Sequence, residues 1–402
     1  MKTLDQLLQE RLQELESASL LRNLREIDSP QGTSLNINGS CVLNFSSNDY
    51  LGLANHPHVK SAALAAIKQY GTGSGASRLI SGSLAPHHQL EESLAIFKRT
   101  EAALTFSSGY ATALGTISAL VGPEDTVVVD RLVHASVLDA VRLSRARLRT
   151  FEHNSLEDLE TELSKTRTSG RSGNILIVTE SIFSMDGDSA PLTRIVELKQ
   201  KHKAWLMVDE AHAIGVRGSQ GRGLVQELGL GNAVEIQMGT LGKALGAAGG
   251  YICGSKSLIN YLINKARSFI FTTAPSPAAA AAAKAAIDLC QSEEGEASRK
   301  KLWQNIDSFK AALNFASISQ LPPESAIIPI HIGDERVATR VANQLREAGI
   351  FIPAIRFPTV ARGTARLRVT LSAGHTPEQL NLLCSQLQAI LQSLTPSDQV
   401  NP

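Results

Sequence analysis

The middle of the chain alternates short runs of β-branched residues with longer segments of helical periodicity. This alternation restricts the fold more than any other feature, because it predicts a largely parallel β-sheet covered by helices. Several runs are apolar throughout, as expected of strands that are buried on both faces. The predicted strands cover residues 126–130, 174–179, 205–209, 235–238 and 250–253. Ligands of such sheets bind beyond the carboxyl ends of the strands, so the residues that follow each strand are the first candidates for a functional site.

The last hundred residues have the pattern of a smaller α/β domain. After an Ala-rich helical segment the sequence turns polar and charged over residues 291–302, which indicates a domain boundary near residue 290. A chain of 402 residues is long enough for two or three domains of ~150 residues. The elements expected in the small domain are strands at 326–331 and 366–370 and a helix at 377–394. The predicted parts are an N-terminal helical segment (1–45), a large domain (46–290) and a small C-terminal domain (291–402).

The charge balance argues against nucleic acid and membrane partners. Lys and Arg number 39 and Asp and Glu number 38, so no overall field attracts a polyanion or an anionic lipid surface. Aromatic residues make up only 4% of the chain, which leaves few platforms on which bases could stack. The longest apolar stretch, at 278–283, is far shorter than the ~20 residues that cross a bilayer. Of the broad classes of function, chemistry on a small molecule therefore remains.

The cysteines and the N-terminus predict a cytoplasmic protein without a metal site. Cys41, Cys253, Cys290 and Cys384 are scattered, without the spacing of a zinc site or of a disulfide framework. The N-terminus has helical periodicity and several acids, whereas a signal peptide has an apolar core. We therefore expect a reducing compartment and no export.

Two residues that can act on one ligand follow neighbouring predicted strands. Asp209 ends one strand, and Lys243 follows the next within a Gly-rich turn, thirty-four residues later. Gly242 lets the backbone approach a planar ring closely, and partial desolvation would lower the pKa of the lysine toward that of a nucleophilic amine. A Schiff-base lysine requires these properties. Taken alone, the same hexapeptide is equally typical of a surface lysine in a turn, but its combination with the strand-end acid favours a site.

Other motifs for phosphate binding or hydrolysis do not match. A P-loop requires Gly at Gln237 and Ser or Thr at Ala244. The Gly-rich run at 70–75 does not have the spacing of a dinucleotide-binding loop, and no predicted strand leads directly into it, so it is either a flexible turn or a loop at a ligand site. No G-x-S-x-G is present, which gives a hydrolase nucleophile little support.

Five blocks of sequence resemble a known family. The chain resembles the fold-type I pyridoxal-phosphate enzymes, in particular the α-oxoamine synthases, which join an amino acid to an acyl thioester with loss of carbon dioxide. The blocks are residues 44–53 (NFSSNDYLGL), 130–136 (DRLVHAS), 183–192 (FSMDGDSAPL), 209–212 (DEAH) and 363–368 (GTARLR). The resemblance implies a large cofactor-binding domain, a small C-terminal domain and a homodimer with active sites at the subunit interface.

Carried over by position, the resemblance assigns the residues around the cofactor ring. Lys243 would form the Schiff base, and Asp209 would keep the pyridinium nitrogen protonated so that the ring can accept electrons from the amino-acid α-carbon. His134 would stack on the ring, contact substrate and polarise the thioester carbonyl. His212 would lie near the ring hydroxyl, and Ser184 would complete the ring contacts. The ordinary alternatives are a strand-end cap for Asp209, a solvated His134 and a capping role for Ser184.

The phosphate is expected at the turn Ser108, Gly109 and Tyr110. A helix at 111–120 follows this turn and offers unpaired amides, although the same residues taken alone predict only a helix start. Thr240 would add a hydroxyl. Because a neighbouring subunit often completes this site in the family, Thr272 or Thr273 is a further candidate.

The substrate residues lie mainly near the C-terminus. Arg368 matches the arginine that binds the amino-acid carboxylate, a role suited to a planar bidentate group. Arg366 has the same parity along a strand, so the sequence leaves exchanged roles open. Arg22 and Thr359 match acyl-substrate positions. Phe357 stands where relatives commonly have Pro, which puts the shape of the acyl pocket in question.

Within the family, the blocks favour L-alanine and a pimeloyl thioester as substrates. The acyl carrier, CoA or a carrier protein, is left open. Glycine with acetyl-CoA or succinyl-CoA is the nearest alternative, and a non-catalytic protein that binds pyridoxal phosphate is a more distant one. Asp209, His212 and Lys243 argue against the last, because binding alone does not require an electron sink.

Overall fold

The computed structural model describes residues 2–168, 172–313 and 324–394, and the contacts within the chain define two units. The large unit comprises Asn48–Leu302, and the small unit comprises Met1–Ser47 with Trp303–Pro402. The first residues of the chain thus belong with the last. The three-part division expected from the sequence stays a prediction. Among the described residues no helix is both long and apolar enough to cross a membrane.

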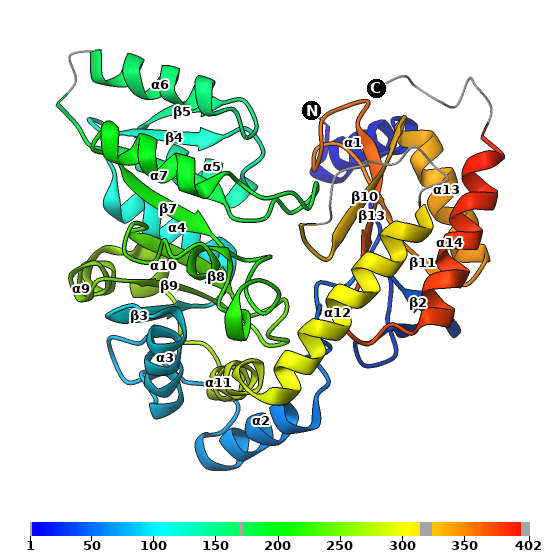
Figure 1. Cartoon of the computed structure of the whole chain (residues 1–402), viewed down its shortest axis with the longest axis horizontal. Helices are drawn as coiled ribbons and strands as arrows, with labels where there is room; N and C mark the ends of the chain where they lie inside the picture. The colour runs from blue at the N-terminus through cyan, green and yellow to red at the C-terminus, as the bar shows by residue number, and fades with distance from the viewer. Residues whose placement is uncertain (1, 169–171, 314–323, 395–402) are drawn as a thin grey trace. The chain divides into compact units, whose positions relative to one another are not determined.

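The large unit is built on a seven-stranded sheet in the order β3-β9-β8-β7-β6-β4-β5 (Figure 1). β9 runs antiparallel to both of its neighbours, and every other pairing is parallel. All five predicted strands are confirmed, as β4, β6, β7, β8 and β9. β3 and β5 were not predicted. The strands are β3 (Ala102–Phe106), β4 (Thr126–Asp130), β5 (Arg147–Phe151), β6 (Ile175–Glu180), β7 (Trp205–Asp209), β8 (Ile236–Thr240) and β9 (Gly250–Gly254).

Helices cover the sheet because successive strand residues point to opposite faces and both faces are apolar. Val127 and Val129 of β4 pack in one cluster with residues of α4, α5, α9 and α10, while Val128 between them is equally buried. The helices of this unit are α2 (Pro57–Tyr70), α3 (Ala85–Lys98), α4 (Gly109–Leu120), α5 (Ala135–Ser144), α6 (Leu156–Thr168), α7 (Leu192–Lys201), α8 (Leu224–Glu227), α9 (Lys256–Lys265), α10 (Arg267–Ile270) and α11 (Pro277–Gln291). A 3₁₀ turn, η1, covers Ser219–Gly221, and α12 (Glu293–Ala312) continues into the small unit.

The small unit holds two three-stranded sheets. One has the order β1-β2-β11 and the other β10-β13-β12. Strands and a helix were expected near 326–331, 366–370 and 377–394, and they are present as β10, β13 and α14. The strands are β1 (Ser34–Ile37), β2 (Ser40–Asn44), β10 (Ile327–Gly333), β11 (Ile350–Phe351), β12 (Ala354–Ile355) and β13 (Ala365–Thr370), and the helices are α1 (Leu4–Ser17), α13 (Glu335–Glu347) and α14 (Pro377–Gln392).

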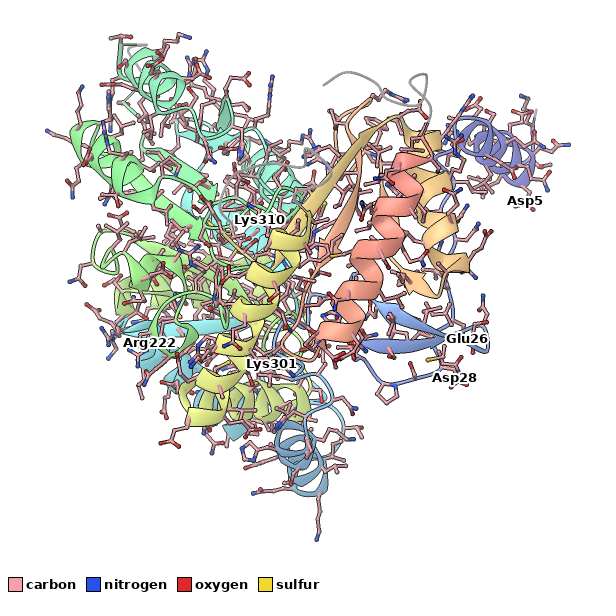
Figure 2. All side chains as sticks on the ribbon, turned by 45° about the vertical axis from the view of Figure 1, so that its right-hand side comes forward. Asp5, Glu26, Asp28, Arg222, Lys301 and Lys310 are labelled. Carbon is pink, nitrogen blue, oxygen red and sulfur yellow. The ribbon has the colours of Figure 1, made fainter. Side chains whose placement is uncertain are left out.

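The sequence predicted a helical segment over residues 1–45, but the structure shows one helix followed by two strands. α1 begins at a capping box formed by Thr3 and Gln6 and has no buried residue; Asp5 lies on it (Figure 2). The chain then forms β1 and β2, and β2 pairs in parallel with β11. A partner some three hundred residues away stabilises this strand, and periodicity within a short window cannot reveal such a partner.

Candidate active site

The carboxyl ends of β6, β7 and β8 lie in register and bring the candidate residues together. Glu180 of β6 pairs with Asp209 of β7, and Asp209 pairs with Met238 of β8. Asp209 is buried, and its Oδ1 accepts a hydrogen bond from the amide of Ala211 at 2.9 Å. This contact fixes the carboxylate at the start of the turn that carries His212.

Lys243 contacts His212 directly. The distance between Lys243 Nζ and His212 Nε2 is 2.7 Å, and the other ring nitrogen, Nδ1, lies 2.6 Å from the Tyr50 hydroxyl. Tyr50 and His212 are both almost completely buried, whereas Lys243 is half-buried. The buried pair therefore holds the lysine amine at the sheet edge while leaving it accessible to a ligand. Tyr50 lies in one of the five blocks, but no role could be read for it from the sequence.

Glu180 connects two of the expected ligand-contacting segments. Its Oε1 accepts the His134 amide at 2.7 Å, and the carboxyl also accepts the amide of Ser184. Burial, and then the charge of Asp209, raise the pKa of Glu180 to about 8. Sequence reasoning missed this residue, although the strand-end argument applied to Asp209 would have indicated it. His134 itself has its pKa lowered by desolvation and by Lys243, against the opposing effect of Asp209.

The first turn of α4 lies beside Thr240 and is the candidate anion site. Ser108 is the N-cap, and its hydroxyl accepts the Ala111 amide at 3.1 Å. The first-turn amides of Gly109 and Tyr110 then have no acceptor within the helix, which is the arrangement that binds phosphate. A Cβ on Gly109 would lie 3.8 Å from Thr240 Oγ1, so this hydroxyl is adjacent to the turn.

Gly250 allows α4 to approach the sheet this closely. A Cβ at Gly250 would lie 2.9 Å from the backbone of Gly109 and 2.4 Å from Thr112 Oγ1. Any other residue would push the helix start away from β9 and from Thr240. The candidate anion site therefore depends on a glycine outside the motifs that predicted it. Thr272 and Thr273, the candidates for a contact from a neighbouring subunit, follow α10.

The residues predicted to bind substrate lie in the small unit. Arg22 Nη2 lies 3.5 Å from Thr359 Oγ1 and 3.4 Å from the carbonyl of Phe357, so the two acyl-site candidates are neighbours. Arg366 and Arg368 are both buried on β13, where their equal parity places them on the same face. Arg366 Nε donates to the Thr364 carbonyl at 3.2 Å. Their placement leaves both arginines as candidates for the carboxylate.

The set of groups in the large unit fits pyridoxal phosphate. An amine, a strand-end carboxylate and a helix N-terminus are the three features that an aldehyde, a pyridinium nitrogen and a phosphate require. Asp209 and Lys243 both act electrostatically on His134 and on Glu180, which shows that these four groups share one local environment.

Comparison with known proteins agrees with this chemistry. The family model of aminotransferase class I and II matches residues 40–387. The chain is 48% identical over 369 residues to the 8-amino-7-oxononanoate synthase of Geobacter sulfurreducens, covering 92% of this chain and 94% of the relative. It is 45% identical over 360 residues to 8-amino-7-oxononanoate synthase 1 of Bacillus subtilis, covering 90% and 91%.

Solved structures of enzymes from the same family have a similar fold. A serine palmitoyltransferase from S. paucimobilis, with a bound PLP–myriocin aldimine, superposes with a TM-score of 0.91 at 28% identity, covering 98% of this chain and 99% of that one. The 8-amino-7-oxononanoate synthase of Francisella tularensis has a TM-score of 0.73 at 29% identity, covering 87% and 97%. The chain therefore belongs to the class I and II aminotransferase family of fold-type I enzymes. Its predicted resemblance to the α-oxoamine synthases is confirmed, since the curated relatives described above are 8-amino-7-oxononanoate synthases.

Proposed function

We propose that this protein is an 8-amino-7-oxononanoate synthase, which condenses L-alanine with a pimeloyl thioester in biotin biosynthesis. The curated relatives described above match nine-tenths or more of the chain, so they support the assignment for the whole protein. The structural observation that carries the proposal is the contact of Lys243 with buried His212, beside the strand-end carboxylate of Asp209. A protein that only bound the cofactor would not require this arrangement.

In the reaction, a bond forms between the α-carbon of alanine and the thioester carbonyl carbon. The C–S bond of the thioester breaks to release the thiol carrier, and the bond from the α-carbon to the carboxylate breaks to release carbon dioxide. When bound, pyridoxal phosphate supplies an aldehyde for the amino group and a ring that accepts the electrons of the α-carbon. The protein has to bind, orient and exchange protons.

Four side chains provide these functions. Lys243 Nζ accepts the α-proton and later returns it, and its amine is held at the sheet edge by His212. Asp209 holds a proton on the ring nitrogen by its negative charge. His134 donates a hydrogen bond to the thioester oxygen. Arg368 binds the carboxylate of alanine until it leaves as carbon dioxide.

The remaining contacts divide between cofactor and acyl chain. Ser108, Gly109, Tyr110 and Thr240 bind the phosphate, and Ser184 and His212 contact the ring. Arg22 and Thr359, which neighbour each other in the small unit, bind the acyl substrate. We further propose a cytoplasmic homodimer, in which Thr272 or Thr273 of a second subunit completes the phosphate site.

Turnover of purified protein with a matrix of substrates tests the assignment. Alanine, glycine and serine are each combined with pimeloyl-, acetyl-, succinyl- and palmitoyl-CoA, and the products are identified by mass spectrometry. We expect one efficient combination, alanine with the pimeloyl donor, to give 8-amino-7-oxononanoate. Turnover confined to glycine with a short donor would instead assign the protein to another α-oxoamine synthase, and turnover confined to serine with palmitoyl-CoA would assign it to the serine palmitoyltransferases.

A further inference from the structure

A histidine that none of the assigned roles uses lies between two carboxylates at the same sheet edge. His153 Nδ1 is 3.0 Å from Asp130 Oδ1, and His153 Nε2 is 2.7 Å from Asp188 Oδ2. Asp130 ends β4 and is completely buried, whereas His153 follows β5 and Asp188 follows β6. The Asp130–His153–Asp188 bridge therefore joins three segments that are distant in sequence.

The geometry of the bridge favours a protonated ring. Neutral imidazole has one N–H, so one of the two carboxylates would then face a lone pair at hydrogen-bonding distance. As imidazolium, His153 donates to both. Desolvation lowers the pKa of His153, but the hydrogen bonds to Asp130 and Asp188 outweigh it and raise the pKa to about 10. His153 therefore carries a positive charge at neutral pH.

Neighbouring contacts fix the ring and the turn that carries it. The ring of Phe183 meets His153 edge-on, with centroids 4.4 Å apart at 89°. Asn154 has a left-handed backbone with φ 56°, its amide donates to Asp130 Oδ2 at 2.9 Å, and its side chain donates to Asp188 Oδ2 at 2.9 Å. Asn tolerates this conformation better than most residues, so the turn delivers both His153 and Asn154 to the same two carboxylates.

The charged residues next to Asp130 and His153 in the chain pair with each other. Glu152, next to His153, pairs with Arg131 at 2.5 Å, and both of these side chains are largely exposed. Asp130 from β4 and Asp188 from the loop after β6 are thus the charged groups in contact with the ring. The protonation of His153 follows from these two carboxylates.

Both ends of the bridge lead to residues assigned to the cofactor. Asp130 begins the segment that carries His134, and its Oδ1 also accepts the Leu132 amide at 2.8 Å. Asp188 lies four residues beyond Ser184 in the loop whose start is held by Glu180. Glu180 connects these two segments at one point, and the bridge connects them at a second. A single contact would leave the segments free to rotate about it, so the second contact restricts their relative orientation.

We propose that His153 is a positioning residue for the active site, which as an imidazolium holds the segment of Ser184 against the segment of His134. The inference rests on the proposed function, because it takes His134 and Ser184 as ligand-contacting residues. Loss of the bridge leaves the sheet intact and loosens the two segments. Since the pKa of His153 is raised, the stability that its protonation contributes is fully present at the ordinary histidine pKa of about 6.5 and is lost as the pH rises through about 10.

The test compares holo-protein carrying His153→Gln or Asp188→Asn with the parent. His58→Gln, on the exposed part of α2, is the matched control. Hydrogen exchange, corrected for its intrinsic pH dependence, is followed in peptides covering 131–134 and 183–190 between pH 6 and 10.5, and the dissociation constant of pyridoxal phosphate is measured alongside. Labelled histidine provides an NMR titration of the His153 ring.

We expect His153→Gln to speed exchange in both peptides and to weaken cofactor binding about tenfold, the lower end of the effect seen when a residue supporting a ligand is removed. Asp188→Asn retains the shape but removes one carboxylate, so the His153 ring should titrate at lower pH and exchange in 183–190 should rise at that lower pH. His58→Gln should match the parent.

Parent-like exchange in both peptides of His153→Gln would overturn the proposal, and so would a His153 ring in the parent that loses its proton near pH 6.5. These readouts do not need turnover. A failure of the proposed function would appear as the wrong product in the substrate matrix, with the exchange results unchanged, so the two failures are distinguishable.

Discussion

The edge of the large sheet and the region of Arg22 and Thr359 in the small unit hold their functional groups in different ways. At the sheet edge, Asp209, His212 and Glu180 are buried and each has a fixed hydrogen-bond partner within 3 Å. Arg22 and Thr359 are both exposed and are joined by a contact of 3.5 Å. Buried and satisfied polar groups have one orientation, whereas exposed ones exchange partners with water.

This difference matches the tasks proposed for the two regions. Groups that hold and move protons on a cofactor must keep their geometry through every turnover. Groups that bind a flexible acyl chain can adapt to it. Substitutions should therefore have large effects at the sheet edge and small effects near Thr359.

Lys243→Ala should give the largest effect. Loss of the amine removes both the covalent anchor and the group that moves the α-proton, and the second alone contributes about 10²–10⁴-fold. We expect no visible absorbance band from bound cofactor and no measurable turnover. Lys265→Ala, at an exposed position, is the control. An unchanged absorbance band in Lys243→Ala would exclude this lysine as the anchor.

Glu210→Gln should lower the free energy of unfolding, because Glu210 follows Asp209 at the sheet edge and is part of a buried ion pair. Glu210 and Lys98 form a completely buried ion pair, and Glu210 Oε1 also accepts the Val225 amide at 2.9 Å. Removing one charge leaves Lys98 buried without its partner, which costs about 3–5 kcal/mol of unfolding free energy.

The measurement is urea unfolding of the holo-protein. Glu160→Gln breaks the exposed pair with Lys201 and should leave the unfolding free energy nearly unchanged. Equal losses of unfolding free energy in the two variants would show that the buried ion pair of Glu210 stabilises the protein no more than an exposed pair does.

Arg368→Ala should raise the KM for alanine by roughly thirtyfold, since truncating one partner of a buried charge pair costs about 2 kcal/mol or more. The kcat should change less. Arg366→Ala separates the two candidates on β13, and exposed Arg336→Ala is the control. If Arg366→Ala alone raises the KM, the roles of the two arginines are exchanged.

Thr359→Val should have the smallest effect of the series. It retains the side-chain shape and removes one hydroxyl in an exposed region, so the KM for the pimeloyl donor should rise about threefold, in keeping with a net hydrogen bond of about 0.5–1.5 kcal/mol. The KM for alanine in the same variant is the internal control. If Thr359→Val raised the KM for the pimeloyl donor as much as Arg368→Ala is expected to raise the KM for alanine, the contrast between the two regions would disappear.

The sequence was a good guide where function follows from a strand end. Runs of apolar residues predicted β4, β6, β7, β8 and β9, and Asp209, His212 and Lys243 lie at or just after the ends of two of them. β5 escaped because its alternating charged residues give no buried-strand pattern. His153 follows β5, so the bridge could not be seen until the strand was placed beside β4.

The remaining contacts join residues that are distant in the sequence and meet only in the folded chain. Tyr50 reaches His212 across 162 positions, and Gly250 matters only because the start of α4 packs against it. Neither residue lies in a local sequence pattern that predicts its role, because that role depends on the residue it contacts in space. The pairing of β2 with β11 is of the same kind.

By itself, the sequence determined the parallel sheet and the family and marked Lys243 and its strand-end acid as candidates, because periodicity and short motifs are local properties of the chain. Only the tertiary structure decided which groups these residues and their neighbours contact: Glu180 between two loops, His212 against Lys243, and His153 between two carboxylates. The physical reason is that hydrogen bonds and charge pairs act over a few ångströms in space, and the chain brings such groups together from positions that its sequence does not link.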